Sequence, residues 1–368
     1  MGWRVRTGCL AWLVHAVCRR ARDGAHFGRM CSAKLDLRRV PLAHRRAFGW
    51  LLEPARLIQK DPLTFVERPA TAFARMEQRL EAIIDREIAE GGADAFGRRL
   101  FEPMASIPVS EWKHAPERLA KHVARRRDRV VRSRGGTPLL MLIQRAHRSV
   151  RNGPLLALRH PEHHGRATLH AWKHVLDVSR TRGEARANAI LDAIAVIWEG
   201  VYQPYLQCIW KLAEVAAGRA PPSPPSQGPL VAALERMLTP SSASLLEPRA
   251  VRIRNAVAHR HFEYLPKQRA VMLSNKDGWT ETFPVHDLEG MMHEMLVIST
   301  GTFDEAMNAF TEDAFMRPLL PLLPAFARAV VADDRAEVER IGLLVNEEAA
   351  GIWRDVAILF GRAPASTS

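Results

Sequence analysis

The spacing of apolar residues along the chain predicts helices over most of its length. Apolar side chains recur every three or four positions, which is the repeat of one face of an α-helix. In the first half of the chain such stretches cover 71–92, 116–136, 166–180 and 184–218. The last of these is the longest, and Gly200 and Pro204 within it are expected to kink the helix or to split it in two.

The second half of the chain combines helical stretches with one short hairpin. A Pro- and Ser-rich segment at 219–229 is expected to form an exposed loop. Strand-forming residues on both sides of the turn residues 275–278 predict a β-hairpin over 268–283. Further helices are expected at 230–238, at 245–261, from His286 onward, and in two pieces over 318–360. The pattern therefore predicts a mainly α fold, a helical bundle with a small β-hairpin.

Positive charge is concentrated in one segment of the chain. Residues 113–186 hold 18 Lys and Arg against 5 acids, which accounts for the whole net charge of +13, and they hold 8 of the 15 His. Such a segment is typical of a protein that binds a polyanion, although a solvated basic face without a partner has the same composition. Its densest part supplies the candidate nucleic-acid-binding residues Arg125, Arg126, Arg127, Arg129, Arg132 and Arg134.

The N-terminus and the cysteines indicate the cellular compartment in which the protein is expected. The apolar run from Cys9 to Cys18 is interrupted by His15, lacks a cleavage site and is too short to span a bilayer. The 4 Cys form no CxxC pair and match no zinc-site spacing. We therefore expect free thiols and a cytoplasmic protein that does not contact a membrane; Met30 is a candidate for the true start.

Candidate chemistry lies in the stretch VRIRNAVAHRHFEY, residues 251–264. On a helix, Leu246, Ala250, Ile253 and Val257 form one apolar stripe. Asn255 and His259, four residues apart, lie nearly opposite that stripe together with Arg252, whereas Arg254 lies about 140° from His259. A histidine of near-neutral pKa is suited to acid–base catalysis, and a guanidinium to stabilising a phosphorane-like transition state.

The motif Arg254-Asn255-x-x-x-His259 resembles the R-x4-6-H signature of HEPN domains. The surroundings resemble that superfamily as well, because a long helical pair precedes the motif, the motif ends a helix, and a hairpin follows. The resemblance covers roughly 184–312. It implies an all-α domain that dimerises through the 245–261 helix, and it is shared by many bacterial antiviral defence and toxin proteins.

The resemblance also implies an activity, which is metal-independent RNA cleavage without a cofactor. In that scheme the 2′-hydroxyl attacks the adjacent phosphate. His259 is then the acid and base, Arg254 stabilises the phosphate and Asn255 positions it. RNA is the expected partner, with an antitoxin or another protein as a second one. The Arg254 and His259 side chains of two protomers would share one cleft.

With this resemblance the chain divides into four parts. They are an extension that is non-native or flexible (1–29), a basic helical region (30–183), the HEPN-like domain (184–312) and acidic C-terminal helices (313–368). The region before residue 184 resembles no family.

Other functions stay open at this point. The same surfaces suit a non-catalytic module that binds nucleic acid or protein, and the motif also fits a plain surface helix. His170 and His174 have a spacing that can bind zinc, with His160, His163 and His164 nearby, but the surrounding Arg and Lys favour phosphate. Asp192 and Glu199 are candidates for an auxiliary acid. The chain has no Gly-rich phosphate loop, no G-x-S-x-G elbow and no paired-acid motif of a metal nuclease.

Overall fold

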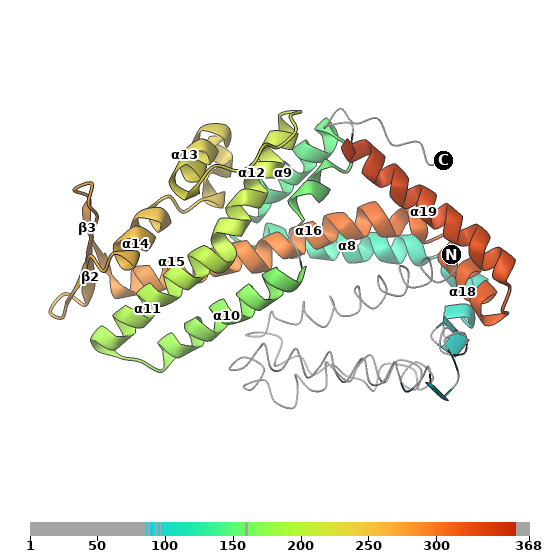
Figure 1. Cartoon of the computed structure of the whole chain (residues 1–368), viewed down its shortest axis with the longest axis horizontal. Helices are drawn as coiled ribbons and strands as arrows, with labels where there is room; N and C mark the ends of the chain where they lie inside the picture. The colour runs from blue at the N-terminus through green and yellow to red at the C-terminus, as the bar shows by residue number, and fades with distance from the viewer. Residues whose placement is uncertain are drawn as a thin grey trace. The chain divides into compact units, whose positions relative to one another are not determined.

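The computed structural model describes residues 104–158 and 161–357, together with nine positions between 86 and 102. These residues form helices and one small antiparallel sheet, so the expected mainly α fold is confirmed (Figure 1). The expected extension 1–29 and most of the helix expected at 71–92 lie outside the described residues. The chain separates into two compact units: one holds residues up to Ala120 and Phe315–Ala350, and the other holds Lys121–Ala314 and the residues from Gly351.

The first unit contains the C-terminal helices. Its described elements are α7 (Val109–Trp112), α17 (Arg317–Leu319), α18 (Leu323–Val331) and most of α19 (Arg335–Ala357). Phe101 packs edge to face on Phe326 with ring centroids 5.3 Å apart, next to the fully buried Ala327. The break expected within 318–360 lies at 332–334, between α18 and α19, and Asp334 caps α19 by accepting the Glu337 N–H at 3.0 Å.

The second unit is a helical bundle that includes the candidate motif. Its helices are most of α8 (Ala115–Val131), α9 (Gly136–Ser149), α10 (Pro161–Ser179), α11 (Gly183–Ile197), α12 (Gln203–Ala216), α13 (Gln227–Met237), α14 (Arg249–Ala258), α15 (Val285–Leu296) and α16 (Phe303–Thr311). Short 3₁₀ turns, η2 (Gly153–Ala157) and η4 (Pro240–Leu245), join some of them, and the loop 219–226 precedes α13.

A pair of glycines makes the tight connection from α8 to α9. Gly135 has a φ of 70°, in the left-handed region that glycine tolerates. A Cβ on Gly136 would lie 1.7 Å from the carbonyl oxygen of Val130, so no other residue fits there without a shift of the backbone. The helix expected over 116–136 ends at Val131, before the two glycines, and the helix that begins at Gly136 is an addition to the prediction.

One long helical path forms the centre of the bundle. It runs through α11, the π-helical segment η3 (Trp198–Tyr202) and α12 without leaving helical backbone angles. Gly200 and Pro204 were expected to kink or split this stretch. It is not split: Gly200 lies in the π-helical turn η3, and Pro204 lies in the first turn of α12. The path contacts α9, α10, α13, α14 and α15, and most of its residues are buried.

A second path of the same kind packs against the first. It runs through α15, π-helical η5 (Val297–Thr302), α16 and π-helical η6 (Glu312–Met316). The two π-helical segments η3 and η5 contact each other. Between these paths the rings of Trp198, Tyr202, Tyr205 and Phe303 form a chain with neighbouring centroids 5.5–5.6 Å apart. These aromatic residues of the first path are therefore part of the core.

The hairpin belongs to a three-stranded antiparallel sheet. Strands β2 (Ala270–Ser274) and β3 (Thr280–Pro284) lie within one or two residues of the predicted hairpin, and β1 (Phe262–Leu265) pairs with β2 on the other side. The sheet contacts α14 through β2 and α15 through β3 (Figure 1). The sequence pattern predicted two of its three strands.

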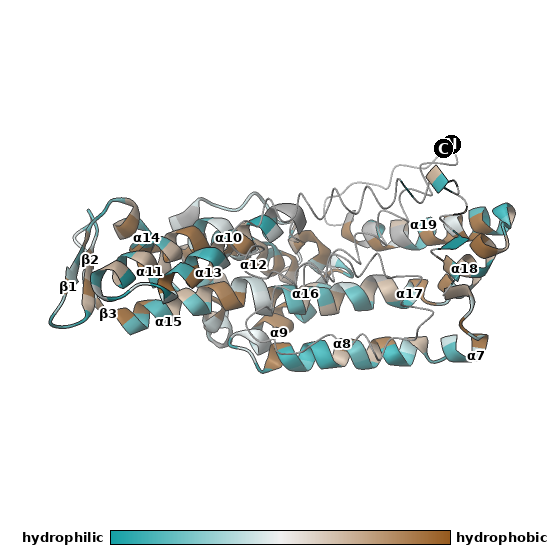
Figure 2. Ribbon diagram, turned by 90° about the horizontal axis from the view of Figure 1, so that it is seen from below, coloured by the Kyte–Doolittle hydropathy of each residue, from teal (hydrophilic) through white to brown (hydrophobic). Residues whose placement is uncertain are grey.

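The basic helices belong to the same unit as the motif. α9 packs against α12 and α10 packs against α11, so the domain boundary expected between residues 183 and 184 falls inside one compact unit. The buried side chains of α9 and α10 need the central path to cover them. Most of α8 is hydrophilic (Figure 2).

Candidate active site

Two buried tyrosines of the central path fix the chain that leads into α14. The hydroxyl of Tyr205 donates a hydrogen bond to the carbonyl oxygen of Leu245 at 3.1 Å, and the hydroxyl of Tyr202 accepts one from the N–H of Glu247 at 2.7 Å. Burial raises the pKa of Tyr202 well above its usual range, so its phenol stays neutral. The candidate helix therefore starts from a defined position.

The burial of α14 follows the predicted apolar stripe with one change. Ala250 and Ile253 are fully buried, while Ala256 takes the third fully buried place and Val257 is half-buried. The helix is shorter than the expected 245–261, because η4 and an extended Leu246 precede it.

The three candidate catalytic residues lie on the half-buried and exposed sides of α14. Arg254 and Asn255 are half-buried and His259 is exposed. A guanidinium nitrogen of Arg254, Nη2, donates to Glu199 Oε1 at 2.7 Å, and Nη1 contacts Asn255 Oδ1 at 3.4 Å. The side chain of Arg254 is 24% exposed, so two neighbours hold the guanidinium while part of it reaches the surface. His259 is not part of this cluster of Arg254, Asn255 and Glu199.

The partner Glu199 comes from the π-helical segment η3. Glu199 and Asp192 were the two acids considered beside the motif; Glu199 bonds to Arg254, whereas Asp192 is exposed and acts electrostatically on His174. π-Helical turns are frequent at functional sites, because they re-aim side chains on an otherwise regular helix. The Nε atom of Arg254 is buried without a hydrogen-bond partner, which leaves one donor of the guanidinium unused.

His259 ends α14 in a tight C-terminal turn. The N–H of His261 donates to the Ala256 carbonyl at 2.8 Å and that of Arg260 donates to Val257 at 3.0 Å, which is a Schellman motif. Arg260 occupies its left-handed position with a φ of 55°. The rings of His259 and His261 lie 5.9 Å apart. This turn directs the exposed His259 away from the buried stripe.

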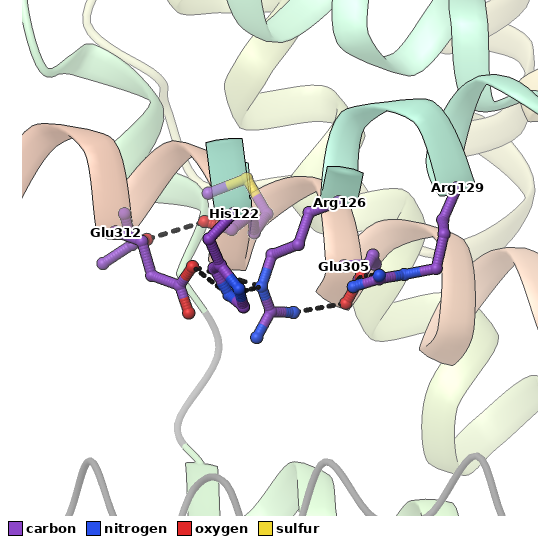
Figure 3. A network of polar contacts seen from close by, with 7 residues as sticks. His122, Arg126, Arg129, Glu305 and Glu312 are labelled. Carbon is purple, nitrogen blue, oxygen red and sulfur yellow. Dashed lines mark hydrogen bonds and ion pairs between the residues drawn. The ribbon is translucent and has the colours of Figure 1, made fainter. Parts of the chain in front are cut away.

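The six candidate nucleic-acid-binding arginines, four in α8 and two directly after it, have different surroundings. Arg126 is buried and pairs with Glu305 and Glu312, and its Nε also donates to His122 Nε2 at 3.0 Å (Figure 3). Arg129 pairs with Glu305. Arg127 pairs with Asp313 at 3.3 Å and Arg134 pairs with Glu294.

Only two of the six remain exposed with no acidic partner among the described residues. These are Arg125 and Arg132. The other four bind acids of α15, α16 and η6, so much of the local positive charge is neutralised within the chain. Binding of nucleic acid by these residues stays a prediction, and the geometry favours Arg125 and Arg132 for it.

The histidines of α10 do not gather into a metal site. Among the described residues no three His, Cys, Asp or Glu side chains lie close enough to hold a metal ion. His164 Nε2 bonds to Asp304 Oδ2 at 2.8 Å, and the rings of His170 and His174 meet edge to face at 4.8 Å. Burial, and then the neighbouring His170, lower the pKa of His174. His160 lies outside the described residues.

Comparisons of the chain with protein-family models, with curated proteins and with solved structures give no match. The HEPN resemblance therefore depends on the motif and its surroundings in this sequence. Of the described helices, none alone is long and apolar enough to cross a membrane; one bent pair, Val285–Leu319 with Leu323–Val331, reaches that length and composition.

Proposed function

We propose that the chain is a cytoplasmic, metal-independent endoribonuclease of the bacterial defence or toxin type. The observation that carries the proposal is the arrangement at α14: Arg254 is held by Glu199 and Asn255, and His259 stands exposed at the end of the same helix. A fixed guanidinium and an accessible imidazole are the two groups that 2′-hydroxyl attack on a phosphodiester requires.

The candidate residues divide the tasks of the proposed reaction. His259 takes the proton from the 2′-hydroxyl, whose oxygen attacks the adjacent phosphorus, and the imidazolium so formed returns a proton to the 5′-oxygen of the next nucleotide as the bond from phosphorus to that oxygen breaks. Arg254 stabilises the negative charge that builds up on the phosphate oxygens, and Asn255 positions them. Glu199 orients Arg254. The products carry a 2′,3′-cyclic phosphate and a 5′-hydroxyl.

A second protomer completes the site in this proposal. Arg254 and His259 diverge by about 140° around one helix. A two-fold related α14, running antiparallel, brings the Arg254 of one protomer towards the His259 of its partner. The small residues Ala256 and Ala258 leave room for such a close approach.

The test is RNA cleavage in the presence of EDTA. Wild-type protein is expected to release fragments with 2′,3′-cyclic phosphate ends, and His259→Ala or Arg254→Ala should lower the rate about 10²–10⁴-fold. His293→Ala is the matched control, because His293 is an exposed histidine of α15 outside the site. Equal cleavage by the wild type, His259→Ala and Arg254→Ala would refute the proposal.

A non-catalytic module that binds nucleic acid or protein is the second candidate. It is favoured by the ion pair that already holds Arg254 and by the four arginines in and directly after α8 that bind acids of the chain. This candidate predicts binding to RNA that weakens steeply with salt, with a logarithmic slope of about −0.7 per phosphate contacted on a single strand, and no cleavage. An affinity that does not change with salt concentration would favour a protein partner instead.

A further inference from the structure

The tip of the hairpin is fastened to the candidate helix. Asn275 Nδ2 donates to the carbonyl oxygen of Arg252 at 3.2 Å, and the N–H of Ser274 donates to the carbonyl oxygen of His261 at 2.9 Å. The strand end at Ser274–Asn275 is therefore held at two points along the segment that contains Asn255 and His259.

The turn itself places one aromatic residue. Asp277 Oδ1 accepts the N–H of Trp279 at 3.1 Å, the N–H of Asn275 donates to the Trp279 carbonyl at 2.9 Å, and Gly278 has the φ of 85° that this turn needs. Trp279 is half-buried and its ring lies 6.3 Å from that of Phe283. The turn thus fixes the backbone of Trp279, and its indole lies next to the Phe283 ring.

Arg252 lies over this indole and has no acidic partner. Its guanidinium carbon is 5.7 Å from the centre of the Trp279 ring, within the range of a cation–π contact. The side chain is exposed, and none of the described carboxylates lies within ion-pair distance of it. Arg249 and Arg254, which flank it on α14, are paired with Glu247 and Glu199. Arg252 is therefore the arginine of α14 whose charge is free for a ligand.

Arg252 also stands on the same side of α14 as the candidate histidine. Arg252 and His259 are seven positions apart, which is about two turns, about 10 Å along the axis and about 20° around it. A planar cation that is backed by an indole and lies beside an acid–base residue is an arrangement for holding a nucleobase, since unpaired bases of RNA stack on aromatic rings and on guanidinium planes.

We propose that Arg252 and Trp279 form a stacking ledge for one base of single-stranded RNA that flanks the cleaved phosphate. This inference rests on the proposed ribonuclease function and adds its substrate class. The ledge contacts only the flat face of a base by stacking, so it accepts different bases. It needs an unpaired base, because a base stacked within a duplex has no free face to offer.

The test measures binding of a fluorescent single-stranded RNA to protein that carries His259→Ala, so that no cleavage interferes. Adding Trp279→Ala or Arg252→Ala is expected to weaken the affinity about 10-fold or more, and Trp279→Phe should keep most of it, because a phenyl ring still backs the guanidinium. The double variant should lose little more than either single one, since the two residues act together. Circular dichroism melting of each variant establishes that it is folded.

The matched control is Arg249→Ala on the same helix. Arg249 lies 5.8 Å from the Phe283 ring, a similar cation–π geometry, but its charge is bound to Glu247. Its removal should leave RNA affinity unchanged. A folded Trp279→Ala protein with wild-type affinity, or equal losses in Arg249→Ala and Arg252→Ala, would overturn the ledge.

Cleavage kinetics of protein that retains His259 distinguish this inference from the function on which it rests. In active protein, Trp279→Ala should raise KM while kcat changes less than about threefold. Cleavage with an unchanged KM in Trp279→Ala overturns the ledge and leaves the ribonuclease intact. Binding that depends on Arg252 and Trp279, in a protein that does not cleave RNA, supports the ledge and refutes the catalysis.

Discussion

Arg260 keeps the end of α14 in a backbone conformation that residues other than glycine rarely adopt. Its φ of 55° places it at the left-handed position of the Schellman turn, where glycine is the usual residue. A non-glycine residue there costs roughly 1 kcal/mol in conformational energy. Such strain is common at functional sites, and this turn directs His259.

The first prediction is that glycine at position 260 relieves this strain. Arg260→Gly should raise the free energy of unfolding by about 0.5–1 kcal/mol, measured by urea denaturation, because glycine adopts a positive φ without a steric cost. The control is Arg125→Gly, at an exposed position inside α8, which should lower stability by about 1 kcal/mol. Destabilisation by Arg260→Gly would show that its side chain makes a stabilising contact that outweighs the strain.

A second prediction concerns the phenol of Tyr202. Tyr202→Phe leaves the N–H of Glu247 without its acceptor and should cost about 1–2 kcal/mol. Because burial raises the pKa of Tyr202 in the folded state, the folded protein keeps a proton that the unfolded chain loses above about pH 10. The stability of the wild type should therefore fall above that pH.

The measurement is the free energy of unfolding between pH 9 and pH 11 for the wild type and Tyr202→Phe. One retained proton contributes a slope of up to about 1.4 kcal/mol per pH unit, and the variant should lack that part of the slope. Parallel curves for the two proteins would mean that Tyr202 ionises equally in both states.

At the scale of elements, periodicity predicted most helices and missed what depends on distant contacts. α9 was not predicted, because five consecutive apolar residues, 139–143, hide the helical repeat that its buried positions follow. β1 has only four residues and owes its existence to pairing with β2. The π-helical η3 kept the central path continuous where Gly200 and Pro204 predicted a break, since packing against η5 and α10 supports it.

The contacts of α8 lead to the third prediction, which compares two adjacent arginines. Arg126→Ala should lower the free energy of unfolding by about 3–5 kcal/mol. The largely buried carboxylates of Glu305 and Glu312 would then lose the positive charge that offsets their desolvation. Arg125→Ala removes an exposed charge and should change stability by less than about 0.5 kcal/mol. Urea denaturation of both variants decides the matter.

RNA binding by the same two variants tests the division of roles on α8. Arg125→Ala should weaken binding and reduce its salt dependence, because Arg125 is exposed and has no acidic partner among the described residues. Folded Arg126→Ala protein should bind as the wild type does. The opposite result would mean that the acids release Arg126 when RNA binds.

At the scale of the molecule, the sequence indicated the candidate site residues but not their surroundings. Arg254, Asn255 and His259 follow from six consecutive positions, and the helix that carries them follows from local periodicity. The bond from Arg254 to Glu199 joins residues 55 positions apart, and the contact of Arg252 with Trp279 depends on how the hairpin lies on α14. The neutralisation of α8 depends likewise on acids more than 150 positions away.

The divergence of Arg254 and His259 on one helix makes the composite site testable by mixing two inactive variants. If each site takes Arg254 from one protomer and His259 from its partner, a heterodimer of Arg254→Ala and His259→Ala contains one intact site and one site that lacks both groups. After equal mixing and full exchange, half of the dimers are mixed, so the RNA cleavage rate should recover to about a quarter of the wild-type rate. Each variant alone should stay inactive.

The control is a mixture of two His259 variants, His259→Ala and His259→Asn, which should not recover because every site lacks the imidazole. Sedimentation or light scattering of the same mixtures reports whether dimers form at the concentrations used. Dimers that exchange freely without recovering activity would place Arg254 and His259 of one site in a single chain, and a protein that stays monomeric while cleaving RNA would do the same. Either outcome would require His259 to reach the phosphate held by its own Arg254, which the roughly 140° between them on α14 opposes.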